Sequence, residues 1–381
     1  MFKKYFTWTP QNVLSLVRLG AKFACVWPPD LNTTVHQRFL QDLWLIVTIA
    51  NLIFFQIAVF REILKSYHDP YAFTKNLMNL MILMDILIHI IIFTNHRQRC
   101  QILLSEVIDF FKNATSHQKL VVNNYFKRYA IYHVLFICGH LMGASYYIIV
   151  PVIESNQFPI SAIYPFTTGS KIITTLLYLN QLLATYQTLG LVFGDIILIT
   201  FIWYAAARLE LLGEKMSRVK NNRKLQLLIH EHHQIISCVN EIAKMARPTL
   251  VKSVAIISLI VVNAGLQLIS VNLCFESSML IIARFFIIYG IANLRLYFCA
   301  WPATDLIDAS EQIAFAVYDC DWLSKPITMQ RSMAIIMLRS QKPLVIQFKN
   351  FIVLSKMSVA KFYYLTISYV TTLKVIMMDN K

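Results

Sequence analysis

The chain has 381 residues, of which 57% are hydrophobic and only 14% are charged. A soluble protein of this length needs far more charge to cover its surface, so the composition excludes a water-soluble globular fold. The formal net charge of +15 does not indicate a nucleic-acid partner, because the Lys and Arg residues lie between apolar windows and not in one patch. We therefore predict an all-α, polytopic protein of the lipid bilayer.

Motifs for catalysis, metal binding and disulfide formation are missing. The seven cysteines are odd in number and show no CxxC or Cys/His ligand spacing, so neither a disulfide framework nor a zinc site is indicated. The run His230-Glu231-His232-His233 lacks the spacing of a helical metal-ligand pair. We expect no enzyme, no metal and no cofactor.

Residues 1–42 form a short amphipathic lead. Its apolar residues alternate with Arg18 and Lys22, as in a helix that lies at a membrane surface or re-enters it. The lead has neither the apolar run nor the small-residue cleavage site of a signal peptide. We interpret residues 43–381 as one membrane domain.

Seven apolar windows follow, each long enough to cross a bilayer at about 20 residues per helix. They cover residues 43–60, 77–94, 130–150, 172–207, 252–275, 279–302 and 351–378. The window 172–207 would measure about 54 Å as a helix, against a hydrocarbon core of about 30 Å, so we expect one helix that continues into the cytosol. The amphipathic patterns at 204–251 and 303–350 predict further cytosolic helical extensions.

The basic residues predict the orientation in the membrane. Twenty-four Lys and Arg residues lie in the lead and in the second, fourth and sixth loops, whereas six lie on the opposite side. By the positive-inside rule, the N-terminus is cytosolic and the C-terminus is extracellular. The sequons at Asn32 and Asn113 then fall on the cytosolic side, so we expect neither to carry a glycan.

Ionisable residues inside the windows are functional candidates. Asp85 and His89 lie four residues apart on one helical face. They either serve a function or satisfy each other inside the bundle, and we favour the second interpretation. Asp195 and Arg295 are candidates for another pair.

Two further patterns have more than one interpretation. Met and aromatic residues concentrate in the outer halves of the second, third, fourth and sixth windows, which suits either a pocket for a small volatile ligand or ordinary core packing with interfacial Tyr belts. In the last window, one face is small and hydroxylated, which is typical of a water-filled path or of a helix contact. The residues of this stripe are Ser358, Lys361, Leu365, Ser368, Thr372 and Val375.

The most specific motifs lie near the C-terminus. They are Y-D-C-D-W at Tyr318–Trp322, L-R-S-Q-K-P at Leu338–Pro343, Leu354-Ser355 and Ser368-Tyr369. Weaker agreement along the rest of the chain comes from Leu19-Gly20, Trp27-Pro28, Tyr164-Pro165-Phe166 and His233 with Ile236. Together these motifs closely resemble the signature of the insect odorant receptors, a family whose N-terminus is also cytosolic.

The resemblance implies a subunit of an odorant-gated, non-selective cation channel in the plasma membrane of olfactory sensory neurons. It also implies assembly into a heterotetramer with the shared olfactory coreceptor, and three groups of site residues. The odorant-binding group, in the outer half of the bundle, is Met78, Met81, Met142, Tyr146, Tyr178, Gln181 and Tyr289. The pore group, in the helix at 351–378, is Ser368, Thr372 and Val375. The subunit anchor includes Tyr318, Asp319, Asp321, Trp322, Arg339, Ser340, Gln341 and Pro343.

Some features separate this chain from its family. Its fourth loop is shorter than 50 residues and lacks the long insertion of the coreceptor, so the chain resembles an odorant-tuned subunit. Val353 stands where the family usually has Pro, and Lys361 and Lys374 would oppose cation flow if they faced the pore. The alternative function is a G-protein-coupled chemoreceptor, which would need the opposite orientation in the membrane.

Overall fold

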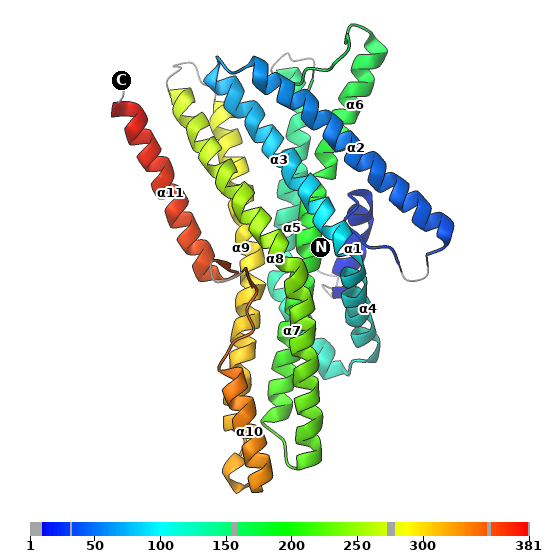
Figure 1. Ribbon diagram of the computed structural model, residues 1–381, viewed down its shortest axis with the longest axis vertical. Coiled ribbons are helices and arrows are strands. Elements are labelled where there is room, and N and C mark those ends of the chain that lie inside the picture. Colours follow the sequence, from blue (N-terminus) through cyan, green and yellow to red (C-terminus); the bar gives the residue numbers. More distant parts are fainter. Residues whose placement is uncertain (1–9, 31–32, 154–157, 273–278, 349–351, 380–381) are drawn as a thin grey trace, which may run out of the picture.

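The computed structural model describes residues 10–30, 33–153, 158–272, 279–348 and 352–379. Within these residues the chain is a bundle of long helices with one short hairpin (Figure 1). The elements are α1 (Pro10–Phe23), α2 (Val35–Lys65), α3 (Pro70–Asn95), α4 (Arg97–Asn113), α5 (Ser116–Ile153), α6 (Lys171–Gln187), α7 (Leu189–Met216), α8 (Asn222–Asn272), α9 (Met279–Tyr318), the 3-10 turn η2 (Trp322–Ser324), α10 (Ile327–Ser340), β1 (Gln347–Phe348), β2 (Ile352–Val353) and α11 (Lys356–Asp379).

The predicted all-α, polytopic fold is confirmed. The seven predicted windows correspond to α2, α3, α5, the α6–α7 pair, α8, α9 and α11. On the described residues alone, five spans are long and apolar enough to cross a membrane, and they lie in α2, α3, α5, α6–α7 and α8. The polytopic arrangement therefore follows from helix length and composition.

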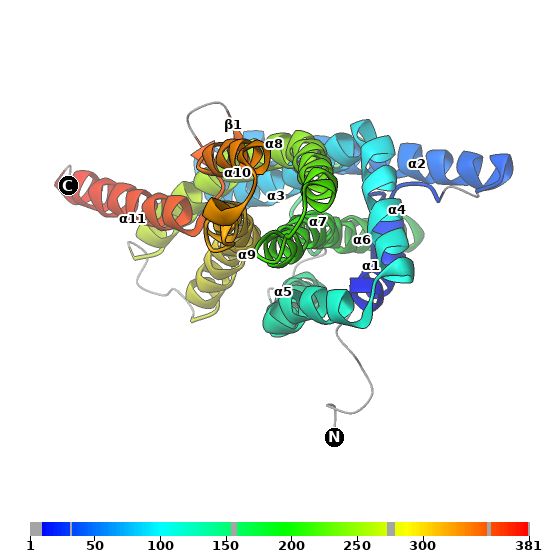
Figure 2. The same cartoon turned by 90° about the horizontal axis from the view of Figure 1, so that it is seen from below.

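Helix α7 is the centre of the bundle. Of residues 189–212, all are buried except Phe193, Arg208 and Glu210. Figure 2 shows α7 enclosed by α5, α8 and α9, with α3 behind α8. A helix that is apolar on every side gains most from such an enclosed position, because each face then leaves the lipid or water for protein packing.

The predicted single helix over the window at 172–207 is interrupted at Thr188, between α6 and α7. The hydroxyl of Thr188 donates to the Thr185 carbonyl at 2.6 Å, and the Thr185 hydroxyl donates to the Gln181 carbonyl at 2.8 Å. Such side-chain bonds compete with the helical backbone and bend it. The interruption lets α6 diverge from α7 at the end that carries the α5–α6 connection (Figure 1).

Helices α8 and α9 are longer than predicted. The later part of the expected extension at 204–251 and the expected span at 252–275 form one continuous helix, α8, which passes through Pro248. Helix α9 likewise continues past Pro302 to Tyr318. At 51 and 40 residues, they measure about 77 and 60 Å, so both extend well beyond a hydrocarbon core of about 30 Å.

The amphipathic lead is shorter than predicted, because α2 begins at Val35, inside the expected lead of residues 1–42. The apolar face of α1 packs on α7 within the main core and includes Val13, Val17 and Ala21. The predicted amphipathic pattern is therefore present, and its apolar side faces protein.

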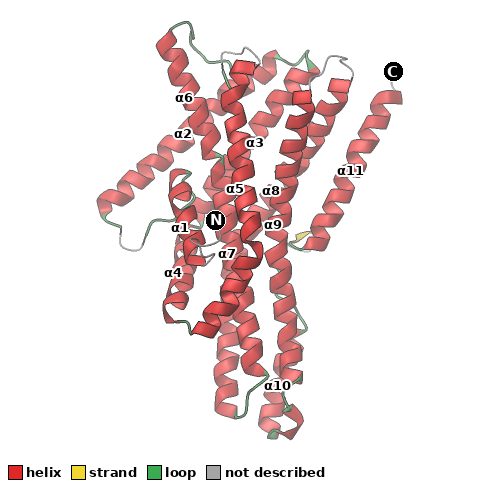
Figure 3. Ribbon diagram, turned by 180° about the vertical axis from the view of Figure 1, so that it is seen from behind, coloured by secondary structure: helices red, strands yellow, loops and turns green. Residues whose placement is uncertain are grey.

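The chain reaches α11 through the end of the bundle that projects farthest from the termini. There α10 packs on the lower part of α9, and an extended segment returns to the hairpin (Figure 3). The hairpin pairs Gln347 with Val353 and Phe348 with Ile352. Helix α11 then rises beside α8 and α9, and diverges from them toward its C-terminal end (Figure 1).

The orientation can be tested through glycosylation. Asn113 ends α4, at the opposite end of the bundle from the α5–α6 connection (Figure 1), whereas Asn32 lies outside the described residues. In eukaryotic cells, we expect endoglycosidase treatment to leave the gel mobility of the native chain unchanged, because cytosolic sequons are not glycosylated. A Thr168→Asn variant, which creates an Asn-Gly-Ser sequon on the opposite side, should gain a glycan. A glycan on Asn113 and none on the new sequon would show the reverse orientation.

Candidate functional site

Four ionised side chains meet inside the bundle, each from a different helix. Asp85 comes from α3, Asp195 from α7, Lys252 from α8 and Arg295 from α9, and each side chain is at most 5% exposed. Arg295 joins the two carboxylates, with its Nη1 at 2.5 Å from Asp85 and its Nε at 2.5 Å from Asp195. Lys252 Nζ lies 2.5 Å from the other oxygen of Asp85. We call these four residues the charge cluster.

The charge cluster carries two positive and two negative charges, so it is neutral as a whole. An isolated charge in such a place would cost several kcal/mol, whereas paired and hydrogen-bonded charges are tolerated. His89 joins the cluster through its Nδ1, which lies 3.2 Å from Lys252 Nζ. Its ring lies against Gly194, where an added Cβ would stand 2.1 Å from His89 Nε2. Glycine at 194 therefore allows α3 and α7 to approach closely enough for the ion pairs to form.

The sequence prediction for these residues was right for one pair and wrong for the other. The Asp195–Arg295 pair is confirmed. Asp85 and His89 do not bond to each other, because Asp85 bonds to Lys252 and Arg295, and His89 contacts Lys252. Lys252 was missed because it stands at the first position of a predicted window, where a lysine usually reaches out to the interface.

The predicted odorant-binding residues of α3, α5, α6 and α9 lie in the half of the bundle that carries the α5–α6 connection, which we call the outer half after its predicted orientation. Met78 is fully buried, and Met81, Tyr146, Tyr178 and Tyr289 are partly buried. Direct bonds bring the first three helices together, since Tyr147 Oη donates to Asn79 at 3.0 Å and Tyr178 Oη donates to the Ile148 carbonyl at 3.3 Å. Residues next to Met78 and Tyr146 are thus in contact.

Two residues of that group have other positions. Met142 is 69% exposed, so its side chain faces away from the helices of its own chain. Gln181 is fully buried, but its amide oxygen accepts from the Ile160 N–H, and its amide nitrogen donates to the Ile160 carbonyl and the Tyr164 hydroxyl. Gln181 therefore fixes the α5–α6 connection to α6, and we leave both residues out of the pocket proposed below.

Several polar contacts in the same outer half were not predicted. Asn263 of α8 donates to the Thr74 carbonyl of α3 at 2.8 Å, and Asn180 of α6 donates to Asn51 of α2. Amides inside apolar windows hydrogen-bond across helices, and that signal was present in the sequence. They join α2, α3, α6 and α8 around the predicted pocket.

The predicted pore residues lie on the face of α11 that points away from the chain's own bundle. Val359, Phe362, Tyr363 and Thr366 are buried or half-buried, and the Tyr363 hydroxyl donates to the Asn293 carbonyl of α9. Ser368, Thr372 and Val375 are exposed and lie on the opposite side of the helical wheel. Lys361 is also exposed on that side, and the side chain of Lys374 lies outside the described residues.

The predicted anchor residues lie at the end of the bundle that carries α10 (Figure 3), in two groups. Tyr318 to Trp322 lie at the junction of α9 and η2, whereas Arg339 to Pro343 lie at the C-terminal end of α10 and just after it. Ser340 is buried and Trp322 and Pro343 are half-buried, whereas the other five are exposed. Exposed apolar side chains surround them, as at an interaction surface. These side chains are Phe315, Leu323, Ile327, Ile335 and Leu338.

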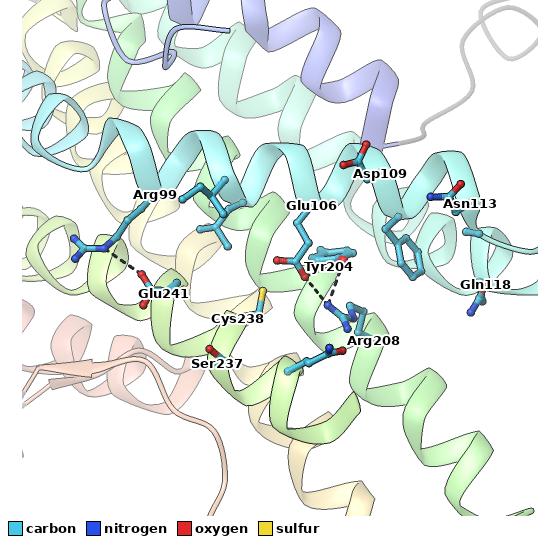
Figure 4. A pocket seen from close by; sticks show the side chains of 15 residues that line it. Arg99, Glu106, Asp109, Asn113, Gln118, Tyr204, Arg208, Ser237, Cys238 and Glu241 are labelled. Atoms are coloured by element: carbon cyan, nitrogen blue, oxygen red, sulfur yellow. Dashed lines mark hydrogen bonds and ion pairs between the residues drawn. The ribbon is translucent and has the colours of Figure 1, made fainter. Parts of the chain in front are cut away.

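A hollow of about 820 Å³ lies between α4, α7 and α8. Figure 4 shows two ion pairs on its wall, Arg208 with Glu106 at 2.5 Å and Arg99 with Glu241 at 3.1 Å. Burial raises the pKa of the Cys238 thiol to about 12, so that thiol stays protonated at neutral pH. Because each guanidinium already has a carboxylate partner, the ion pairs hold α4 against α7 and α8.

Comparisons with known proteins agree with this architecture. A profile of the 7tm Odorant receptor family matches residues 69–364. Odorant receptor 13a of Drosophila melanogaster is 24% identical over 252 residues, which cover 60% of this chain and 60% of that protein. Odorant receptor 67a of the same fly is 25% identical over 183 residues, 45% of this chain and 44% of that protein. The chain thus spans about half the length of these curated relatives.

Solved structures share the whole fold. The insect olfactory receptor OR5 from Machilis hrabei superposes with a TM-score of 0.81 at 13% identity, over 95% of this chain and 97% of that one. The structure of the same receptor in complex with eugenol gives a TM-score of 0.76 at 13% identity, over 96% of this chain and 99% of that one. At this identity, the likeness establishes a common fold.

The charge cluster can be tested by removing one charge or two. Asp195→Asn leaves the Arg295 guanidinium without one carboxylate in a buried place, and we expect a loss of about 3–5 kcal/mol in stability. Thermal melting of the receptor in nanodiscs should show this as a lower Tm.

The matched control removes both partners. Asp195→Leu combined with Arg295→Met leaves the Asp85–Lys252 pair neutral, so it should recover most of the lost Tm. Equal losses in the single and double variants would show that packing, and not charge balance, dominates at this place.

Proposed function

The chain belongs to the 7tm odorant receptor family, and we propose that it is the odorant-tuned subunit of an odorant-gated, non-selective cation channel. In this proposal it assembles into a heterotetramer with the shared olfactory coreceptor. Its place is the plasma membrane of olfactory sensory neurons, with the N-terminus in the cytosol and the C-terminus outside.

The observation that carries the channel proposal is the position of the hydroxyl stripe on α11. Ser368 and Thr372 are exposed, on the side opposite the residues that pack on the chain's own bundle. Hydroxyl groups that faced lipid would find no hydrogen-bond partner there. The same face, directed at α11 of neighbouring subunits, would line a path for hydrated ions. Such a pore needs α11 helices from several subunits. The divergence of α11 from its own bundle agrees with this, because it leaves that helix available to neighbouring subunits.

The odorant pocket is proposed for the outer half of the bundle, among Met78, Met81, Tyr146, Tyr178 and Tyr289. These side chains are apolar with a few hydroxyls, which suits a small volatile molecule whose affinity comes mainly from apolar burial. The related receptor from Machilis hrabei has been solved with eugenol, a small aromatic molecule. Gating would follow if the odorant binds the open state more tightly than the closed one.

The subunit anchor is proposed for the cytosolic end, where α9, η2 and α10 expose aromatic and aliphatic side chains. Arg339 donates to the Lys342 carbonyl, which fixes the C-terminal end of α10 and the segment after it. An exposed surface of this kind, built on a rigid helical pair, suits a permanent contact between subunits.

The proposal is tested by whole-cell currents to an odorant panel, with and without the coreceptor and with G-protein signalling blocked. We expect a fast cation current that needs both chains and survives the block. A slow current abolished by the block, in cells with surface-labelled receptor, would support the chemoreceptor alternative.

The proposed pocket is tested by Tyr146→Ala. This substitution should shift the half-maximal odorant concentration by about tenfold, because burial of an aromatic side chain contributes at least about 1.4 kcal/mol to binding. Its surface expression should be unchanged.

Lys361 should set the size of that current. It is exposed on the same side of α11 as Ser368 and Thr372, two turns before Ser368, which is the side proposed to line the pore. A positive charge within about 10 Å of the ion path would repel cations. We expect Lys361→Gln to raise the single-channel conductance by about twofold. Lys356→Gln is the matched control, because the Lys356 ammonium lies 4.7 Å from the Trp301 ring centre and faces its own bundle. Equal conductance in both variants would place Lys361 away from the ion path.

A further inference from the structure

The outer end of the bundle carries a hollow whose lining shares no residue with the proposed odorant pocket. It has a volume of about 430 Å³ and lies between the C-terminal end of α2 and the α5–α6 connection. Its wall includes Glu62, Phe158, Tyr164, Phe166, Thr167 and Thr168. The Tyr164-Pro165-Phe166 motif of the sequence thus has a place at this hollow that the channel function does not use.

The loop that forms this hollow is held in a defined position. The Ile163 N–H donates to the Ala58 carbonyl of α2 at 3.0 Å. Gln181 of α6 bonds both backbone groups of Ile160 and the Tyr164 hydroxyl, at 2.9 to 3.1 Å. These bonds join the loop to α2 and α6, so the aromatic rings on the loop are fixed before any ligand arrives.

Three aromatic rings form one wall of the hollow. Tyr164 stacks on Phe166 with 5.9 Å between ring centres, and Phe158 meets Tyr164 edge-on at 5.8 Å. The Tyr164 ring is buried beneath the others, and Phe166 is 46% exposed. A ring face presents negative charge density, which attracts a cation placed over it.

Glu62 supplies a full negative charge at the same hollow. Its side chain is half-buried, and within the part of the chain that the structure describes it has no ion-pair or hydrogen-bond partner for its carboxylate. Arg61 and Lys65 stand near it on α2, yet neither comes within ion-pairing distance of it. A carboxylate without a partner that lines the same hollow as aromatic rings has the features that recognise an organic ammonium group.

We propose that this hollow is a binding site for organic ammonium ions, with Glu62 as the counter-charge and Phe158 and Phe166 as the ring faces. The hydroxyls of Thr167 and Thr168 accept hydrogen bonds from a primary or secondary amine. The site lies outside the apolar pocket, so a polar amine that cannot enter the bundle can still bind the receptor.

Choline is the probe for this site, because its neutral isostere, 3,3-dimethyl-1-butanol, has the same shape without the charge. Radiolabelled choline should bind the full receptor in nanodiscs in a saturable way, and excess 3,3-dimethyl-1-butanol should compete at least about tenfold more weakly than unlabelled choline. Glu62→Gln should weaken choline binding by at least about threefold, and Phe166→Leu by a similar factor. Glu311→Gln, which changes an exposed carboxylate on α9 away from the hollow, should leave binding unchanged.

Two outcomes would overturn the proposal. Absence of saturable choline binding to the wild-type receptor removes the site. Binding that is equally strong in Glu62→Gln and Phe166→Leu places it elsewhere. Elution of all variants at the wild-type volume in size-exclusion chromatography confirms that lost binding is not lost folding. The assay needs no ion current, so its result is independent of the channel proposal.

Discussion

Two carboxylates and two cationic side chains, buried to at least 95%, join α3, α7, α8 and α9 at one place. The cluster is stable only when its charges balance, because each unpaired charge would cost several kcal/mol in the interior. Because each charged side chain must point at its partners, this requirement fixes the rotation of all four helices about their axes. The other hydrogen bonds between helices, such as those of Asn79 and Asn263, then form in the one register that these rotations allow.

The charge cluster lies between two parts of the bundle that are held together by different contacts. Above it, the outer half holds the proposed odorant pocket and is joined by single hydrogen bonds between amides, hydroxyls and carbonyls. Below it, long extensions of α7, α8 and α9 pack with α10. Helix α11 is outside the cluster and meets the bundle along one narrow face. A ligand in the outer half therefore acts on helices that these hydrogen bonds join, away from the charge cluster. Among the side chains of α11 that the structure describes, none takes part in an ion pair of the cluster.

Much of this fold was predictable because its main determinants are local in sequence. Apolar windows show where helices cross a bilayer, and the motif at Tyr318–Trp322 indicates the family. The Thr188 interruption was not predictable from apolarity, because it arises from hydroxyl groups that compete for backbone carbonyls. The continuity of α8 through Pro248 was also missed, because a proline inside a helical pattern usually ends or kinks the helix.

The candidate site was predictable in its regions and less so in its residues. Asp195 and Arg295 were paired correctly because charges inside apolar windows have few possible partners. Gln181 and Met142 were placed in the pocket by their helices alone. Their real positions depend on the loop at 158–170 and on the rotation of α5, which no local pattern encodes. Periodicity shows which residues share a face, but only packing decides what that face contacts.

The exposed face of α11 bears on the composition of the proposed channel. Lys361 lies on the same side as Ser368 and Thr372. Four copies of this chain around one axis would place four lysines within about a Debye length of one another, where like charges repel and a narrow path excludes cations. In an assembly where other subunits supply most of the pore helices, fewer lysines would stand near the ion path, and the odorant pocket of this chain would still be present. Within the proposed function, the lysine thus gives a physical reason for this chain to conduct cations well in a heteromeric channel and poorly in a channel made of this chain alone.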